Sequence, residues 1–130
     1  MQDRIYLSPP HMTEKERQFL MEAFDSNWIA PVGPFIDSFE SGICQFTGIK
    51  SSCAVSSGTA ALHLALRILG IKKGDKILCP TLTFSASANV ILYQNATPIF
   101  VDVDETYWTI DIPAVEKAMK KYKPKAMISV

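Results

Sequence analysis

The sequence predicts an α/β fold in which a mainly parallel sheet is flanked by helices. From residue 51 onward, short apolar runs of strand length alternate with apolar patterns of helical period. Helices between consecutive strands are the crossover connections that parallel strands require. Before residue 51 only an extended start and two helical patterns occur. We therefore expect an N-terminal extended and helical segment at 1–50 and a sheet-containing domain from 51 to 130.

Two amphipathic helices are expected in the N-terminal segment. Thr13 and Glu16 have the spacing of a capping box, which predicts a helix that ends near Asp25. Residues 27–34 contain two prolines and a glycine, so they predict a loop. Apolar residues then recur at helical spacing and predict a second helix over 35–47.

The domain that follows is expected to alternate strands and helices. The predicted strands and helices, in chain order, are 52–55, 59–69, 76–79, 84–93, 98–102, 113–122 and 125–130. The helix at 59–69 is apolar on most sides and is predicted to be buried. The last strand stops without a turn. We therefore expect the chain to be the N-terminal part of a longer protein, truncated within a strand.

Charge and composition exclude several classes of protein. Thirteen basic residues balance thirteen acidic residues, which argues against binding nucleic acid through counterion release. No apolar run approaches the ~20 residues that cross a bilayer, so no membrane partner is expected and the predicted location is cytoplasmic. Cys44, Cys53 and Cys79 lack the spacing of a zinc site, and no metal is expected. We predict that these cysteines are reduced and mostly buried.

The turn at residues 56–59 is the strongest candidate for a binding site. The predicted strand at 52–55 leads through Gly58 directly into a helix, whose first amides and dipole favour an anion such as phosphate. Ser57 and Thr59 add hydroxyl donors. The alternative is that Ser57 or Thr59 only caps the helix. The turn matches neither a Walker loop nor a dinucleotide fingerprint.

Two further places carry side chains of chemical interest. Phe84 follows the second predicted strand among small residues, where its ring suits stacking on a planar heterocycle; the alternative is a core position. Asp102 and Asp104 follow the third strand and are better explained as turn caps than as metal ligands. His63 is interpreted mainly as part of a polar stripe on its helix.

Four blocks of sequence together resemble one family. Residues 26–34, 55–66, 74–84 and 98–104 are similar to successive blocks of the DegT/DnrJ/StrS-type sugar aminotransferases. The resemblance implies the aspartate-aminotransferase fold, known as fold type I, and the cofactor pyridoxal 5′-phosphate (PLP). It also implies amino transfer from glutamate to a keto group of a nucleotide-linked sugar, and a homodimer with its active site between two subunits.

The resemblance also assigns roles to residues of this chain. The cofactor-binding residues it implies are Ser57, Gly58 and Thr59 at the phosphate and Phe84 against the pyridine ring. The substrate-binding residues it implies are Asn27, Trp28, Ile29 and Ala30.

The opening residues 7–12, with 26–30, are closest to the branch of this family that aminates UDP-4-keto-6-deoxy-N-acetylglucosamine. This similarity implies amination at C4 for bacterial polysaccharide or glycan biosynthesis. In the family, the lysine that forms the Schiff base lies beyond the point that corresponds to Val130, so no catalytic residue is expected here and the fragment is expected to be inactive. Relatives without that lysine are sugar dehydratases or non-catalytic proteins, which remains the alternative.

Overall fold

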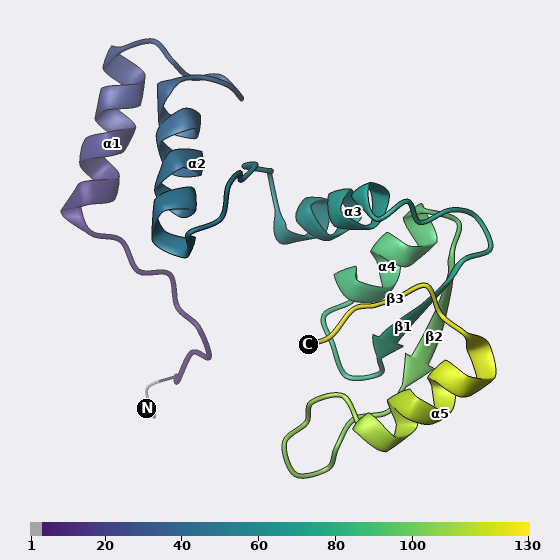
Figure 1. Cartoon of the computed structure of the whole chain (residues 1–130). Helices are drawn as coiled ribbons and strands as arrows, with labels where there is room; N and C mark the ends of the chain where they lie inside the picture. The colour runs from purple at the N-terminus through teal and green to yellow at the C-terminus, as the bar shows by residue number, and fades with distance from the viewer. Residues whose placement is uncertain (1–3) are drawn as a thin grey trace. The chain divides into compact units, whose positions relative to one another are not determined.

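A computed structural model describes residues 4–130, which divide into two compact units between Ala54 and Val55 (Figure 1). The first unit holds two helices and the second holds three strands and three helices. In chain order the elements are α1 (Glu14–Asp25), α2 (Pro34–Thr47), α3 (Gly58–Ile68), β1 (Lys76–Pro80), α4 (Ala86–Tyr93), β2 (Thr97–Val101), α5 (Ile112–Tyr122) and β3 (Ala126–Met127).

Both helices predicted for the first unit are confirmed. The Thr13 amide donates to the Glu16 carboxylate (2.6 Å) and the Lys15 amide donates to the Thr13 hydroxyl, so the capping box starts α1 as expected. The rings of Phe19 and Phe35 meet edge to face, 6.3 Å between centroids. No residue of α1 or α2 is fully buried, so the apolar faces of both helices stay largely exposed.

The loop between α1 and α2 depends on a glycine. Gly33 has φ +136°, which side chains rarely adopt, and its carbonyl accepts from the amides of Ile36 and Asp37 at the start of α2. A Cβ at Gly33 would lie 2.8 Å from Cε3 of Trp28. The indole of Trp28 therefore occupies the space that any larger residue at Gly33 would need.

The predicted strand at 52–55 is wrong, because this segment is irregular. A strand needs a neighbouring ladder, and no strand of the described chain pairs with this segment, which instead bonds to Glu40 of α2. The Ala54 amide donates to the Glu40 carboxylate and the Ser52 hydroxyl donates to the Glu40 carbonyl, both at 2.7 Å. The prediction of mostly buried cysteines is also wrong: Cys79 is buried, Cys44 is half-buried, and Cys53 in this irregular segment is exposed.

The second unit contains the parallel sheet that the sequence predicts. The strand order is β2-β1-β3, and β1 pairs in parallel with both neighbours. Hydrogen bonds from the Thr81 amide to the Val101 carbonyl and from the Ile128 amide to the Leu78 carbonyl, both 2.9 Å, extend the pairing past the strand ends. The other predicted elements of this unit are confirmed, with ends that shift by up to a few residues.

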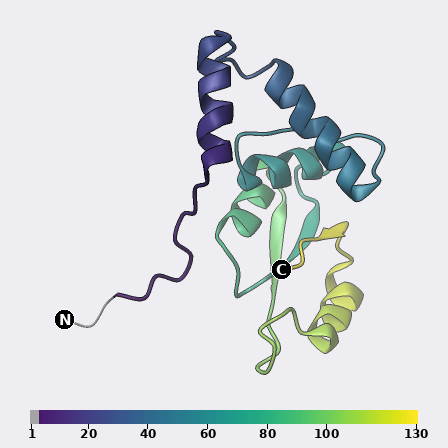
Figure 2. The same cartoon turned by 90° about the vertical axis from the view of Figure 1, so that its left-hand side faces the viewer.

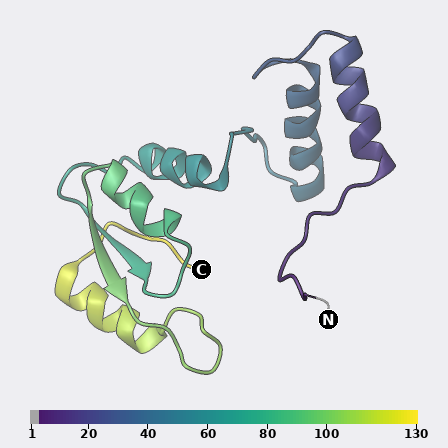
Figure 3. The ribbon, with the colours of Figure 1, turned by 180° about the vertical axis from the view of Figure 1, so that it is seen from behind.

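Helices cover both faces of this sheet, as Figures 2 and 3 show from two sides. Alternate side chains of β1 point to opposite faces, so Ile77 and Cys79 join one cluster while Leu78 joins the other. The first cluster also contains Leu66 of α3 and residues of α4, and the second contains residues of α5. None of the helices within residues 4–130 has the length and apolar character to cross a bilayer.

The prediction that α3 is buried on most sides is wrong. Leu66 is the one fully buried residue of this helix, whereas Leu64 and Ile68 are exposed. Helix α3 packs mainly on α4, and such a contact covers only one stripe of a helix. Helix α3 therefore has more apolar side chains than its packing in the second unit buries.

We expect Gly33→Ala to destabilise the first unit by about 1–3 kcal/mol, because the new Cβ meets Trp28 and the backbone is strained. Gly42→Ala, in the middle of α2 with open space around it, is the control and should stabilise by up to about 1 kcal/mol. Urea unfolding followed by Trp28 fluorescence, with Trp108 replaced by Phe, measures both. Equal effects of the two substitutions would contradict the packing argument.

Acid should remove a contribution of Asp75 to stability. A hydrogen bond from Lys125 (3.0 Å), aided by the Lys72 amide (2.8 Å), holds the pKa of the Asp75 carboxyl below its ordinary value of 3.8. A carboxyl with a lowered folded pKa stabilises the fold above its ordinary pKa, and this contribution disappears as pH falls through the folded pKa. We therefore expect the stability difference between the protein and its Asp75→Asn variant to shrink below about pH 4. Urea unfolding at stepped pH tests this, with Glu116→Gln as the exposed control; parallel curves for Asp75→Asn and the parent would contradict it.

Candidate functional site

The first turn of α3 presents unused backbone donors. Ser57 is the N-cap, and its hydroxyl accepts from the Ala60 amide (3.1 Å) while its carbonyl accepts from the Ala61 amide (3.0 Å). Within the described part of the chain, the amides of Gly58 and Thr59 donate to no acceptor. These two amides and the positive end of the helix dipole favour an anion. Ser57 therefore caps the helix, and this cap leaves the amides of Gly58 and Thr59 available to an anion.

The loop from β1 to α4 forms a second wall. Phe84 lies in this loop with 77% of its side chain exposed, so the alternative of a core position for Phe84 is wrong. Beside it, the hydroxyls of Thr83 and Ser87 are 2.9 Å apart. An exposed aromatic ring on an ordered loop offers a flat apolar surface to a planar ligand.

These two walls line one open cavity of about 720 Å³. Its size falls in the range of small-molecule and cofactor sites. The predicted cofactor residues Ser57, Gly58, Thr59 and Phe84 all line it, so residues 25 or more positions apart in sequence meet at one place. The other lining residues are Ala61, Leu62, Thr83, Ala86, Ser87 and Val130.

Thr83 and Ser87 are lining residues that the sequence analysis did not single out. They stand four residues apart across the start of α4, a spacing that brings side chains to the same side. The spacing alone did not predict their hydrogen bond, because the start of α4 must be known to place both side chains on one side. The sequence placed the helix start at residue 84, whereas α4 begins at Ala86.

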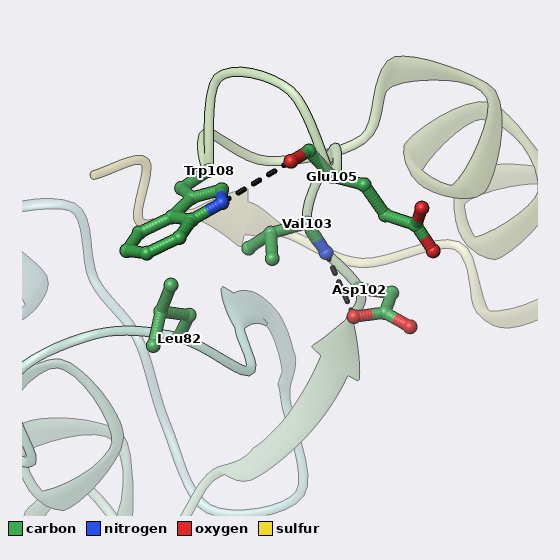
Figure 4. A pocket seen from close by; sticks show the side chains of 5 residues that line it. All are labelled: Leu82, Asp102, Val103, Glu105 and Trp108. Atoms are coloured by element: carbon green, nitrogen blue, oxygen red, sulfur yellow. Dashed lines mark hydrogen bonds between the residues drawn. The ribbon is translucent and has the colours of Figure 1, made fainter.

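A smaller cavity of about 370 Å³ lies where β1 and β2 end (Figure 4). The Asp102 carboxylate there accepts from the Val103 amide (2.9 Å) and from the Thr81 hydroxyl (3.2 Å). Trp108 lies across from Leu82, and its indole N–H donates to the Glu105 carbonyl (3.1 Å). The Trp108 indole N–H and one Asp102 oxygen thus help to hold the loop after β2, and the Glu105 carboxylate has no hydrogen-bond partner among the described residues.

Asp104 has a similar local role. One of its carboxylate oxygens accepts from the amides of Thr106 (2.9 Å) and Tyr107 (2.8 Å). The interpretation as a turn cap is confirmed for Asp104, whereas the Asp102 carboxylate joins the loop after β2 to Thr81 in the loop after β1. Among residues 4–130, no three metal-binding side chains gather in one place. His63 packs edge to face on Tyr93, 5.5 Å between ring centroids, as a contact between α3 and α4.

The predicted substrate residues belong to the first unit. Asn27 adopts φ +60°, Trp28 packs on Gly33, and Ile29 is exposed in the loop before α2. Ala30 is exposed in the same loop. The role of these four residues in binding substrate stays a prediction.

Comparison with known proteins gives the chain a family context. Residues 10–130 match the DegT/DnrJ/EryC1/StrS aminotransferase family. Over its whole length the chain is 48% identical to EpsN of Bacillus subtilis (strain 168), whose name assigns it to the pyridoxal phosphate-dependent aminotransferases, and covers 35% of that protein. It is 42% identical to a GDP-perosamine synthase of Escherichia coli O157:H7, covering 93% of this chain and 33% of that one. The chain thus spans about a third of the length of these relatives.

Solved structures show the same relationship. Spr1654 from Streptococcus pneumoniae, named as a sugar aminotransferase and solved in its PMP form, superposes with a TM-score of 0.85 at 32% identity, over 96% of this chain and 31% of that chain. A GDP-4-keto-6-deoxymannose-3-dehydratase with a trapped PLP-glutamate geminal diamine gives a TM-score of 0.80 at 25% identity, over 88% of this chain and 31% of that chain. The predicted fold type is therefore confirmed, and the chain belongs to the DegT/DnrJ/EryC1/StrS aminotransferase family.

Proposed function

We propose that the complete gene product, called the encoded protein below, binds PLP in the cavity between α3 and the loop before α4. The observation that carries this proposal is the free pair of amides at Gly58 and Thr59, which faces the same cavity as the exposed ring of Phe84. Gly58, Thr59 and the hydroxyl of Ser57 would hold the phosphate, and Phe84 would stack on the pyridine ring. When bound, PLP supplies an electron sink for amino-group chemistry.

Gly58 supports the fit of a phosphate at this place. Its φ is not positive, and a Cβ built on it would meet nothing within 4 Å. Neither the backbone nor the packing of the described chain therefore requires glycine there. A ligand that approaches the backbone closely does require it, as phosphate does at the first turn of a helix.

The reaction we propose is transfer of an amino group from glutamate to the keto carbon, C4, of a UDP-linked 4-keto-6-deoxy sugar. Family membership and the sugar-related names of its relatives support a sugar substrate. The choice of UDP and of C4 rests on the similarity of residues 7–12 and 26–30 to one branch of the family. A relative named as a spore coat polysaccharide biosynthesis protein, 40% identical, supports a role in polysaccharide or glycan biosynthesis.

We further propose that the encoded protein is a cytoplasmic homodimer whose loop at 27–34 contributes to the nucleotide-sugar pocket. Trp28, Ile29 and Val32 are large apolar side chains that stay exposed in this loop. Pro31 and Pro34 stiffen it, which lowers the entropy lost on ordering. Exposed apolar groups on a stiff loop are typical of an interface.

A second candidate function is a PLP-dependent sugar dehydratase or a non-catalytic relative of the same fold. The structural similarity to a GDP-4-keto-6-deoxymannose-3-dehydratase supports the dehydratase as this second candidate. The cofactor cavity would serve an aminotransferase and a dehydratase equally. The two functions differ in whether the sugar product gains nitrogen.

We expect Gly58→Ala to weaken PLP binding at least 10-fold while the free energy of unfolding stays equal or rises by up to about 1 kcal/mol, because alanine suits the first turn of a helix and fills only open space. Gly42→Ala makes the same chemical change in α2 and serves as control. Titration of PLP absorbance and thermal unfolding measure the two quantities. If both variants bind PLP as the parent does, the phosphate assignment is wrong.

With glutamate as donor, the encoded protein should convert a UDP-linked 4-keto-6-deoxy sugar to a 4-amino sugar and release 2-oxoglutarate. Mass spectrometry of the products, with GDP- and dTDP-linked keto-sugars as parallel substrates, tests the reaction and the nucleotide. A product that loses water and gains no nitrogen supports the dehydratase. No change to any of the sugars, in a protein that binds PLP, supports a non-catalytic relative.

A further inference from the structure

Ser87 is an unusual residue of the second unit. Its side chain is 4% exposed, and it is the one buried polar residue among those that the structure describes. Its hydroxyl has a single partner, the hydroxyl of Thr83 at 2.9 Å. A buried hydroxyl is costly unless it is hydrogen-bonded, so this pair is held at a position where an apolar residue would be the simpler choice.

The pair has one more proton than its internal bond uses. Each hydroxyl carries one donor, and the bond between Thr83 and Ser87 uses one of the two protons. Within residues 4–130 the other proton has no acceptor. Other hydroxyls of this chain donate back to a carbonyl of their own helix: Ser26 to Ala23 (3.1 Å) and Thr47 to Ile43 (2.6 Å). Ser87 makes no such bond.

The pair belongs to the wall of the proposed cofactor cavity. Thr83 and Ser87 both line it, opposite the first turn of α3. The amides of Ser87, Ala88 and Asn89 in α4 are engaged, because they donate to the carbonyls of Phe84 and Ser85. The amide of Ala86, which also lines the cavity, donates to no acceptor within residues 4–130. The two hydroxyls therefore join the Ala86 amide as the donors that this wall presents to a ligand.

We propose that the Thr83 hydroxyl donates to the Ser87 hydroxyl, and that Ser87 donates its own proton to an anionic oxygen in this cavity and so positions the pyridine ring of PLP. The inference rests on the proposed function. The phosphate already has the donors at Ser57, Gly58 and Thr59. The acceptor that we propose is the ring oxygen of the cofactor, because this wall stands opposite the phosphate donors of α3.

The test compares Ser87→Ala with Ser87→Thr in the encoded protein. Ser87→Ala removes a hydroxyl proton and should weaken PLP binding about 10- to 100-fold, the loss expected for a hydrogen bond to a charged group. Ser87→Thr keeps the hydroxyl and should bind PLP within about 3-fold of the parent, less than one such bond. Measuring the affinity for the 3-deoxy analogue of PLP, which lacks the ring oxygen, identifies the acceptor.

If the penalty of Ser87→Ala disappears with the analogue, the acceptor is the ring oxygen; a penalty that persists with the analogue would overturn this choice of acceptor. A purely structural role for Ser87 predicts a lower melting temperature of the apoprotein with unchanged PLP affinity, which would overturn the inference. Gly58→Ala separates this failure from that of the proposed function. If the unsubstituted protein binds PLP, Gly58→Ala loses that binding and Ser87→Ala keeps it, the proposed cofactor site stands and only the role of Ser87 is wrong.

Discussion

The second unit depends on the parallel pairing of β1 with both of its neighbours. The side chains of Ile77, Leu78 and Cys79 in this central strand are at most 1% exposed, so both faces of β1 must be covered. Helices α3 and α4 cover one face and α5 covers the other. Because parallel strands end on the same side, the loops after β1 and β2 emerge together. This constraint sets Phe84 and Asp102 at one edge of the sheet.

Local signals in the sequence predicted the elements that local interactions determine. The capping box at Thr13 and Glu16 and the cap at Asp111, whose carboxylate accepts from the Ala114 amide, involve residues at most three positions apart. The run at 52–55 has the composition of a strand, but a strand exists only with a ladder partner. No strand of the described chain pairs with this run, and the Ala54 amide donates instead to Glu40, fourteen residues earlier, a contact that no local pattern predicts.

The candidate site likewise contains residues that local sequence patterns predict and residues that depend on contacts seen only in the structure. A turn between an apolar run and a helix predicted a phosphate site at Ser57, Gly58 and Thr59; the structure brings these residues to one cavity, and their role in binding phosphate stays a prediction. An aromatic residue after a predicted strand was sufficient to point to Phe84. The Thr83–Ser87 pair was not predictable, because it depends on where α4 begins and on which hydroxyl is buried. Pairwise contacts of this kind require coordinates.

The first turns of α3 and α4 face one cavity and differ in the donors that they present. In α3, Ser57 satisfies Ala60 and Ala61 and leaves the amides of Gly58 and Thr59 without a partner among the described residues. In α4, carbonyls of the preceding loop satisfy the amides of Ser87, Ala88 and Asn89, and a pair of side-chain hydroxyls stands beside the single unpaired amide of Ala86. Unpaired amides at a helix start suit a highly charged group, whereas one buried hydroxyl proton suits a single oxygen at a fixed place. A ligand with phosphate at one end and a single anionic oxygen near its ring matches both walls, and this agreement between independent features favours PLP over a simple phosphate.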